Sequence, residues 1–321
     1  MEKLFFELMQ VAVGQLDCLS RGPSPEEWAE LYQTAQRQAV AGICYNGMEK
    51  LFEFGLRAPQ DVSIDWMAEA EEIRMSNTIV NKRCATIQKK LLERKIYTSV
   101  LLGQGIATYY GAELQELRQP KGIDVYVDCG REKAVRFVKQ TGQEHVRHTR
   151  QLVFLDAWED TPVRIHTQVA HTRNRLKNAV IERWFRYNRE QLFQEDEVFV
   201  VPTPRAHLVY ALQYLYGQML SEGIDMRQLM DCFFILKTLN GQFGQFKGGM
   251  TIEKTMKSFL MKRFSCGVMW VMQEVFNVDR KLLPMEPLEE EGRFILQQVM
   301  EGRRVWPLLK RYPLQMMWNF I

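Results

Sequence analysis

The sequence predicts an α+β fold in which a small mixed β-sheet lies between an N-terminal and a C-terminal helical region. Three observations predict it. Before about residue 96, apolar side chains recur at three- and four-residue steps, which is the period of an amphipathic helix. Short β-prone runs gather between about 96 and 172, and helical periodicity returns after them. We therefore expect an N-terminal helical region at 1–95, an α/β core at 96–172 and a C-terminal helical region at 173–321.

The N-terminal region carries clear helix boundaries. Ser24 precedes Pro25, and Glu27 follows the serine by three residues, which is the capping-box pattern of a helix start. Pro59 marks a break before the next helix, because proline is tolerated at a helix start but not inside one.

Four runs in the central region are typical of β-strands, and two helices are expected between them. The strands are predicted at 97–101, 123–127, 151–155 and 163–167, with a hairpin turn at 158–162. The helices are predicted at 106–117 and 132–141, the second ending at Gly142 as its C-terminal glycine. Together these runs predict one sheet.

Helices are predicted again after about residue 172. Pro202 and Pro204 precede an apolar helix at 205–220, and four glycines between 241 and 249 predict a loop. The remainder is expected to be helical, with Trp306, Met316, Met317 and Trp318 in the core.

Composition places the chain among ordinary globular proteins. Its 42 basic and 39 acidic residues give a net charge of +3, too even a balance for a dedicated nucleic-acid-binding protein, although a local basic patch stays open. The six cysteines include no C-x-x-C pair, so the sequence encodes neither a zinc ribbon nor a disulfide framework. With no signal-peptide pattern and no apolar run of about 18 residues, we expect a cytoplasmic protein that does not span a membrane.

Several segments carry a resemblance to a known family. They lie at 28–47, 100–107, 118–127 and 162–185, and another at 222–231 has the pattern Gly-Ile-x-x-Arg-Gln-x-x-Asp. Together they resemble the uncharacterised nucleotidyltransferase family common in gut Bacteroidetes-type bacteria, a branch of the DNA polymerase beta-like nucleotidyltransferases. The resemblance implies a bacterial protein whose α/β core has the minimal nucleotidyltransferase fold.

A glycine-rich turn stands in the second segment. Gly103, Gln104 and Gly105 match the family's Lys-Gly-Gln-Gly turn, but Leu102 occupies the lysine position. Such a turn can present backbone N–H groups to phosphate. The resemblance implies that these three residues bind the ligand without the family's cation.

The third segment resembles a strand on which two aspartates, two residues apart, hold magnesium from the same side. Asp124 matches the second aspartate, whereas Gly122 replaces the first and Lys121 stands where the family has glycine. The resemblance implies that Asp124 is a catalytic metal ligand, here vestigial. Arg118 and Lys121 are candidate ligand-binding residues.

The fourth segment resembles a strand with a glutamate, the third metal ligand, two residues before a histidine. Arg164 fills the glutamate position, and a guanidinium repels Mg²⁺. His166 matches the histidine and is a candidate catalytic residue, or else it packs within the sheet. Asp156 or Asp160 could substitute for a lost ligand, but Asp128 lies about 13 Å from Asp124 along a strand, too far for one ion.

The segment at 222–231 contributes one more ligand candidate. Arg227 is predicted to bind the ligand, and its alternatives are an i,i+4 ion pair with Asp231 or a bond to the neighbouring domain. On the helix before it, Tyr214 and Gln218 lie in the region where the family has histidines.

Three functional hypotheses follow. The first is a pseudoenzyme that acts as a binding or regulatory module for a nucleoside triphosphate, another phosphorylated ligand or a protein partner, with Lys121 and Arg164 replacing the charge of the metal. The second is an active transferase that moves a nucleoside monophosphate from a triphosphate to an acceptor, and only this hypothesis needs Mg²⁺ as cofactor. The third is a structural protein with a filled cleft, in which Asp124 is an ordinary hydrogen-bonded strand residue.

Overall fold

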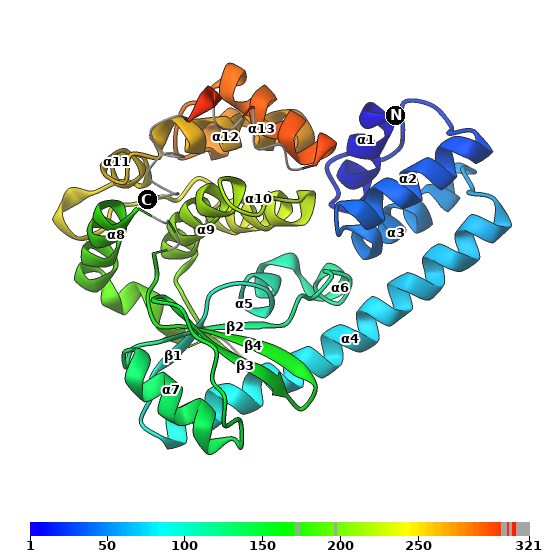
Figure 1. Cartoon of the computed structure of the whole chain (residues 1–321). Coiled ribbons are helices and arrows are strands. Elements are labelled where there is room, and N and C mark those ends of the chain that lie inside the picture. The colour runs from blue at the N-terminus through cyan, green and yellow to red at the C-terminus, as the bar shows by residue number, and fades with distance from the viewer. Residues whose placement is uncertain (171, 173, 196–197, 303–306, 308–309, 313–321) are drawn as a thin grey trace.

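A computed structural model describes the chain except for residues 171, 173, 196–197, 303–306, 308–309 and 313–321 (Figure 1). The fold is α+β as predicted, with helices around a small mixed sheet of four strands. Among the described residues, no helix combines the length and the apolarity that a membrane span requires. The predicted core residues Trp306, Met316, Met317 and Trp318 lie outside the described part.

Two of the first four helices, α2 and α4, begin at the predicted boundaries. Ser24 caps α2: its hydroxyl accepts a hydrogen bond from the Glu27 N–H, and the Glu27 carboxylate accepts one from the Ser24 N–H. Pro59 directly precedes α4, which runs from the N-terminal helices to the sheet (Figure 1). The four helices are α1 (Glu2–Ala12), α2 (Pro25–Arg37), α3 (Ala41–Lys50) and α4 (Gln60–Glu93).

The four predicted strands form one sheet in the order β1-β2-β4-β3. Strand β2 is parallel to β4, and the other two pairings are antiparallel. Glu159 and Asp160 form the predicted hairpin turn, both with positive φ (49° and 70°), as a two-residue turn between right-twisted strands requires. The strands are β1 (Thr98–Val100), β2 (Ile123–Val127), β3 (Leu152–Trp158) and β4 (Thr161–His166).

Alternation along the strands separates two faces of the sheet. Ile123, Val125 and Val127 pack in a buried cluster with residues of α4 and of α7 (Arg131–Gln140). As predicted, α7 ends just before Gly142, which has φ +97°. The other face of β2 and β4 lies toward α9, so polar residues at alternate positions of these strands meet the C-terminal helices (Figure 1).

The continuous helix predicted at 106–117 is wrong. The segment folds as α5 (Gln104–Ala107), a 3₁₀ turn at Thr108–Tyr110 and α6 (Ala112–Gln115). Gly111 interrupts it with φ +74° and ψ 158°, a conformation outside the helical region that glycine adopts without the steric cost of a Cβ. Ile106 and Leu117, whose spacing predicted a helix, are both buried, but the backbone between them is not one continuous helix.

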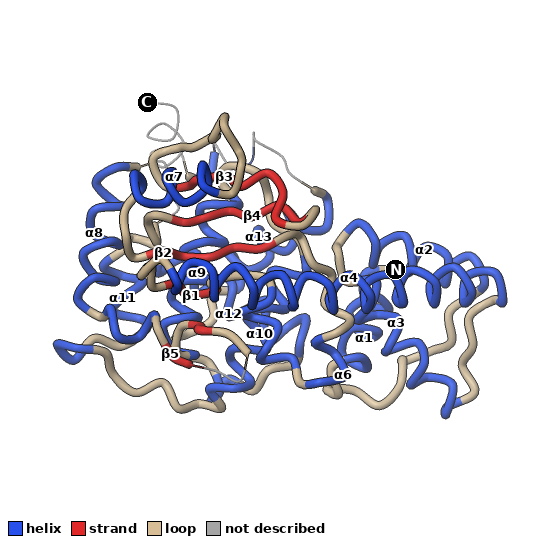
Figure 2. Tube along the Cα trace, turned by 90° about the horizontal axis from the view of Figure 1, so that it is seen from below, coloured by secondary structure: helices blue, strands red, loops and turns tan. Residues whose placement is uncertain are grey.

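The C-terminal region is helical as predicted, with a loop at 240–249 that ends in a short 3₁₀ turn. A small antiparallel pair, β5 (Gln194–Glu195) and β6 (Val200–Val201), was not predicted, because two residues per strand leave no alternation to read (Figure 2). The helices are α8 (Arg175–Tyr187), α9 (Pro204–Met219), α10 (Met226–Leu239), α11 (Ile252–Ser258), α12 (Lys262–Phe276) and α13 (Glu289–Glu301).

Candidate functional site

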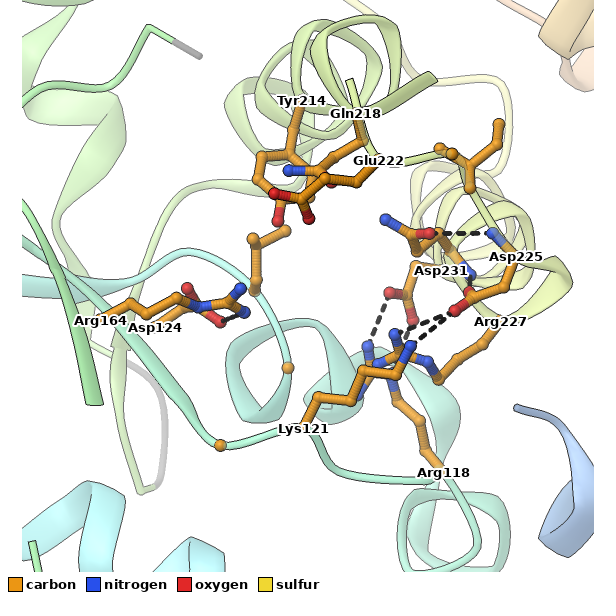
Figure 3. Close-up of a pocket in the computed structure, with 16 residues that line it drawn as sticks. Arg118, Lys121, Asp124, Arg164, Tyr214, Gln218, Glu222, Asp225, Arg227 and Asp231 are labelled. Atoms are coloured by element: carbon orange, nitrogen blue, oxygen red, sulfur yellow. Dashed lines mark hydrogen bonds and ion pairs between the residues drawn. The ribbon is translucent and has the colours of Figure 1, made fainter. Parts of the chain in front are cut away.

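A cleft of about 300 Å³ separates the ends of β2 and β4 from helices α9 and α10 (Figure 3). Residues of both charges line it: the sheet side supplies three cations and one acid, and the helix side supplies three acids and one cation. The lining residues are Leu102, Gly103, Arg118, Lys121, Gly122, Asp124, Arg164, Tyr214, Gln218, Glu222, Gly223, Ile224, Asp225, Arg227, Gln228 and Asp231.

Most of the residues singled out in the sequence lie in this one cleft. The residues that the structure brings together there are Gly103, Arg118, Lys121, Asp124, Arg164 and Arg227. His166 lies directly behind Asp124 and is almost fully buried. Sequence segments more than 100 residues apart therefore converge on one surface, which the strand and helix patterns alone do not determine.

Asp124 is held by two neighbours on the adjacent strand. In the parallel register of β2 and β4, Asp124 is the partner of Arg164, and His166 lies two residues further along the same face. Nη2 of Arg164 donates to Oδ2 of Asp124 at 2.5 Å, and Nε2 of His166 lies 2.7 Å from Oδ1. Both carboxylate oxygens of Asp124 are therefore engaged within the sheet.

The charge of Asp124 is stabilised by these contacts. Burial raises the pKa of the Asp124 carboxyl, but the adjacent Arg164 guanidinium and the His166 hydrogen bond outweigh burial and hold the pKa below its ordinary value. In turn, Asp124 raises the pKa of Arg164. Arg164 remains about one-third exposed and faces the cleft, so its remaining N–H groups can meet a ligand.

A second ion pair joins the loop before β2 to helix α10. Arg118 donates to both carboxylate oxygens of Asp231 at 2.7 Å, and the Tyr110 hydroxyl donates to Oδ1 of Asp231 at 2.7 Å. Both charged side chains are buried, with 2% and 6% of their area exposed. The bidentate geometry is the one that a planar guanidinium favours with a carboxylate.

Of the alternatives for Arg227, the i,i+4 pair with Asp231 is not what the structure shows. Asp231 pairs with Arg118, while Arg227 donates to the Gln119 carbonyl and to Asp225, both at 3.4 Å. Helix α10 is thus bonded to the loop of the α/β core, which was the other alternative. Lys121 completes the group by donating to Oδ2 of Asp225 at 2.9 Å.

The glycine-rich turn is only partly in the cleft. Gly103, with φ +57°, lines the cleft, whereas the Gln104 side chain is buried and donates to the side chains of Asn77 and Asn81 on α4. A Cβ at Gly105 would lie 2.2 Å from the Val100 carbonyl oxygen. Gln104 and Gly105 therefore hold the turn against α4 and β1, and only Gly103 borders the space a ligand could occupy.

The acids considered as substitute ligands lie elsewhere. Asp128 accepts a hydrogen bond from Arg189, and Asp156 accepts one from Arg147, both at 2.5 Å. Asp160 is almost fully exposed in the hairpin turn. Within the described part of the chain, no three His, Cys, Asp or Glu side chains are grouped so that they could hold a metal ion.

Some cleft residues were missed as functional candidates in the sequence. Asp225 is the N-cap of α10, and its Oδ1 accepts from the Gln228 N–H at 3.1 Å, while the Gln228 side chain accepts from the Asp225 N–H. The capping-box spacing of Asp225 and Gln228 could have placed them at a helix start. Nothing in the sequence placed Glu222, which follows α9, in the cleft.

A comparison with models of protein families gives a match. A model of a protein family described as "Uncharacterised nucleotidyltransferase" matches residues 24–277, which is most of the chain and includes the whole sheet and the cleft. No curated protein and no solved structure gives a significant match.

Proposed function

The chain belongs to the uncharacterised nucleotidyltransferase family, and from this premise we propose that it is a nucleotide- or phosphate-binding module rather than a metal-dependent transferase. The ligand is a nucleoside triphosphate or a related phosphorylated compound that binds without Mg²⁺. Cations of the cleft, chiefly Lys121 and Arg164, supply the positive charge that metal ions supply in nucleotidyl transfer.

One observation carries the proposal: both oxygens of Asp124 are engaged by Arg164 and His166. Nucleotidyl transfer needs two Mg²⁺ ions held by anionic oxygens a few ångströms apart. Among the described residues that line the sheet end of the cleft, Asp124 is the one carboxylate, and the guanidinium of Arg164 already engages one of its oxygens. This donor set does not fit a pair of magnesium ions, and no metal-dependent step follows from it.

The open cleft supports a ligand rather than a purely structural role. A structural protein was expected to fill the space between the sheet and the C-terminal helices, yet about 300 Å³ of space remains there. Arg164 and Lys121 line this space and have 36% and 55% of their side chains accessible, so their charges can reach a ligand there.

We also place the protein in the cytoplasm, since all six cysteines are unpaired and four are buried. This placement suits a ligand such as a nucleoside triphosphate, and thiols stay reduced in that compartment.

Isothermal titration calorimetry with ATP tests the proposal. We expect the same affinity in EDTA and in excess MgCl₂, and an affinity about tenfold weaker in Lys121→Gln and in Arg164→Gln, because each loses a charge-assisted contact. Lys139→Gln and Arg136→Gln are matched controls, since both residues are exposed on α7 and outside the cleft. They should leave the affinity unchanged.

The opposite result is equally specific. If Mg²⁺ strengthens ATP binding by orders of magnitude, or if the protein transfers nucleoside monophosphate in a reaction that Asp124→Ala abolishes, then the protein is an active transferase and the proposal is wrong. Activity that survives Asp124→Ala would point to a contaminating enzyme.

A further inference from the structure

We infer that the phosphate group of the ligand binds at the Lys121 and Arg227 end of the cleft, where the Asp225 carboxylate now stands, and that Asp225 is an internal competitor for this subsite. The inference rests on the proposed function, because it needs a phosphorylated ligand. Beyond the proposed function, it specifies which end of the cleft binds the phosphate group and which residue weakens the affinity for the ligand.

Asp225 occupies an anion-binding environment. Its Oδ2 lies 2.9 Å from the Lys121 amine and 3.4 Å from Nη2 of Arg227, and its Oδ1 caps the first turn of α10. Helix α10 has 14 residues, so its N-terminus contributes a positive partial charge in addition to the two cations. A phosphate group is a natural alternative occupant of such a position.

Two buried donors of residues that line this end of the cleft lack an acceptor. Nε of Arg227 and Nη1 of Arg118 have no hydrogen-bond partner, although only 7% and 2% of these two residues are exposed. Buried guanidinium N–H groups are normally paired, because leaving a charged donor without an acceptor costs more than a hydrogen bond returns. A phosphate brings more acceptor oxygens than the carboxylate of Asp225 offers.

Charge balance around this end of the cleft favours an added anion. Figure 3 shows Arg118, Lys121 and Arg227 gathered beside Asp225 and Asp231. Asp231 is held by Arg118 and Tyr110, and the carboxylate in contact with Lys121 and Arg227 is that of Asp225. Burial raises the pKa of Asp225, but Arg227 and Lys121 outweigh it and hold the pKa below its ordinary value, so the residue is charged at neutral pH.

A ligand phosphate therefore has to displace a carboxylate, and the competition can be removed with one substitution. Asp225→Asn removes the negative charge but keeps a side-chain oxygen for the α10 cap, since asparagine caps helices as well as aspartate does. We expect ATP in EDTA to bind Asp225→Asn about tenfold more tightly than the unaltered protein. Tripolyphosphate, which carries no nucleoside, should show the same gain.

Two further variants complete the test. Asp225→Asn combined with Lys121→Gln should lose the gain, because Lys121 is the cation that Asp225 releases. Asp279→Asn is the matched control: Asp279 also caps a helical turn and also pairs with a lysine, Lys281, but lies outside the cleft. It should not change the affinity, and thermal denaturation would verify that each variant is folded.

Each outcome separates the inference from the proposed function. If the unaltered protein binds ATP but Asp225→Asn binds it no more tightly, then the subsite lies elsewhere and only the inference is wrong. A gain for ATP without a gain for tripolyphosphate would also overturn it, because the group competing with Asp225 would not be phosphate. If neither protein binds ATP or tripolyphosphate, the proposed function itself fails.

Discussion

Replacing Asp231 with alanine tests whether the buried ion pair with Arg118 holds the two walls of the cleft together. Arg118 lies on the loop that carries Lys121, and Asp231 lies one turn after Arg227 on α10. Three hydrogen bonds of 2.7 Å end on the Asp231 carboxylate, two from Arg118 and one from Tyr110. The substitution removes all three and leaves the Arg118 guanidinium buried without a counter-charge.

The expected loss in the free energy of unfolding is about 3–5 kcal/mol, which is typical when one partner of a buried ion pair is removed. A pair on the surface would contribute less than about 1 kcal/mol, but only 2% and 6% of these side chains are exposed. Solvent cannot replace the lost carboxylate without opening the contact between α10 and the α/β core. We therefore expect weaker ATP binding as well, since Lys121 and Arg227 lose their fixed separation.

Urea titration followed by circular dichroism measures the change in unfolding free energy. The double variant Arg118→Met with Asp231→Leu is the control, because it removes both charges and should recover most of the stability. A loss below about 1 kcal/mol for Asp231→Ala, or a double variant as unstable as the single one, would refute the reasoning. The first result would mean that the pair is not buried in solution as the structure places it, and the second that the unpaired charge of Arg118 is not the source of the instability.

Two further predictions concern stability away from the cleft. Burial lowers the pKa of His207 from 6.5 to about 4, with the Leu101 carbonyl opposing it, so the folded protein takes up this proton less readily than the unfolded chain. The contribution of neutral His207 to the free energy of unfolding is complete above pH 6.5 and is lost as the pH falls toward 4, a change of about 3 kcal/mol. In urea titrations at several pH values, His207→Gln should lack this part of the acid dependence. Gly105→Ala should lower the free energy of unfolding by about 1–3 kcal/mol, because its Cβ would lie 2.2 Å from the Val100 carbonyl oxygen. In Gly22→Ala the new Cβ would meet only the end of the Leu56 side chain, so the loss in the same assay should be less than about 1 kcal/mol. Equal losses for the two glycine variants would contradict the packing argument.

Local signals in the sequence were sufficient for most of the fold. The capping box at Ser24 and the turn at 158–162 depend on residues a few positions apart, so the local sequence is enough to predict them. There were two exceptions: at 106–117 apolar spacing predicted one helix, which Gly111 divides, and the β5–β6 pair was not predicted. Burial fixes which side chains point inward, but a single glycine decides whether the backbone between them continues.

The part of the candidate site that lies on the sheet could also be predicted from the sequence. Asp124 lies on a strand next to Lys121, and Arg164 and His166 share a face of another strand because side chains alternate with period two. These side chains come into contact once β2 and β4 lie next to each other in the sheet. The roles of these residues stay predictions until ligand binding is measured.

What only the tertiary structure decided is the pairing of charges across the cleft. Spacing made Arg227 the natural partner of Asp231, yet Arg118, 113 residues earlier in the chain, takes that place. An i,i+4 pair on a helix surface contributes only a few tenths of a kcal/mol, whereas a buried, bidentate pair is fixed by the packing around it. The sequence by itself therefore determined which residue types are present and on which elements, while the docking of α10 against the loop before β2 determined which charge meets which.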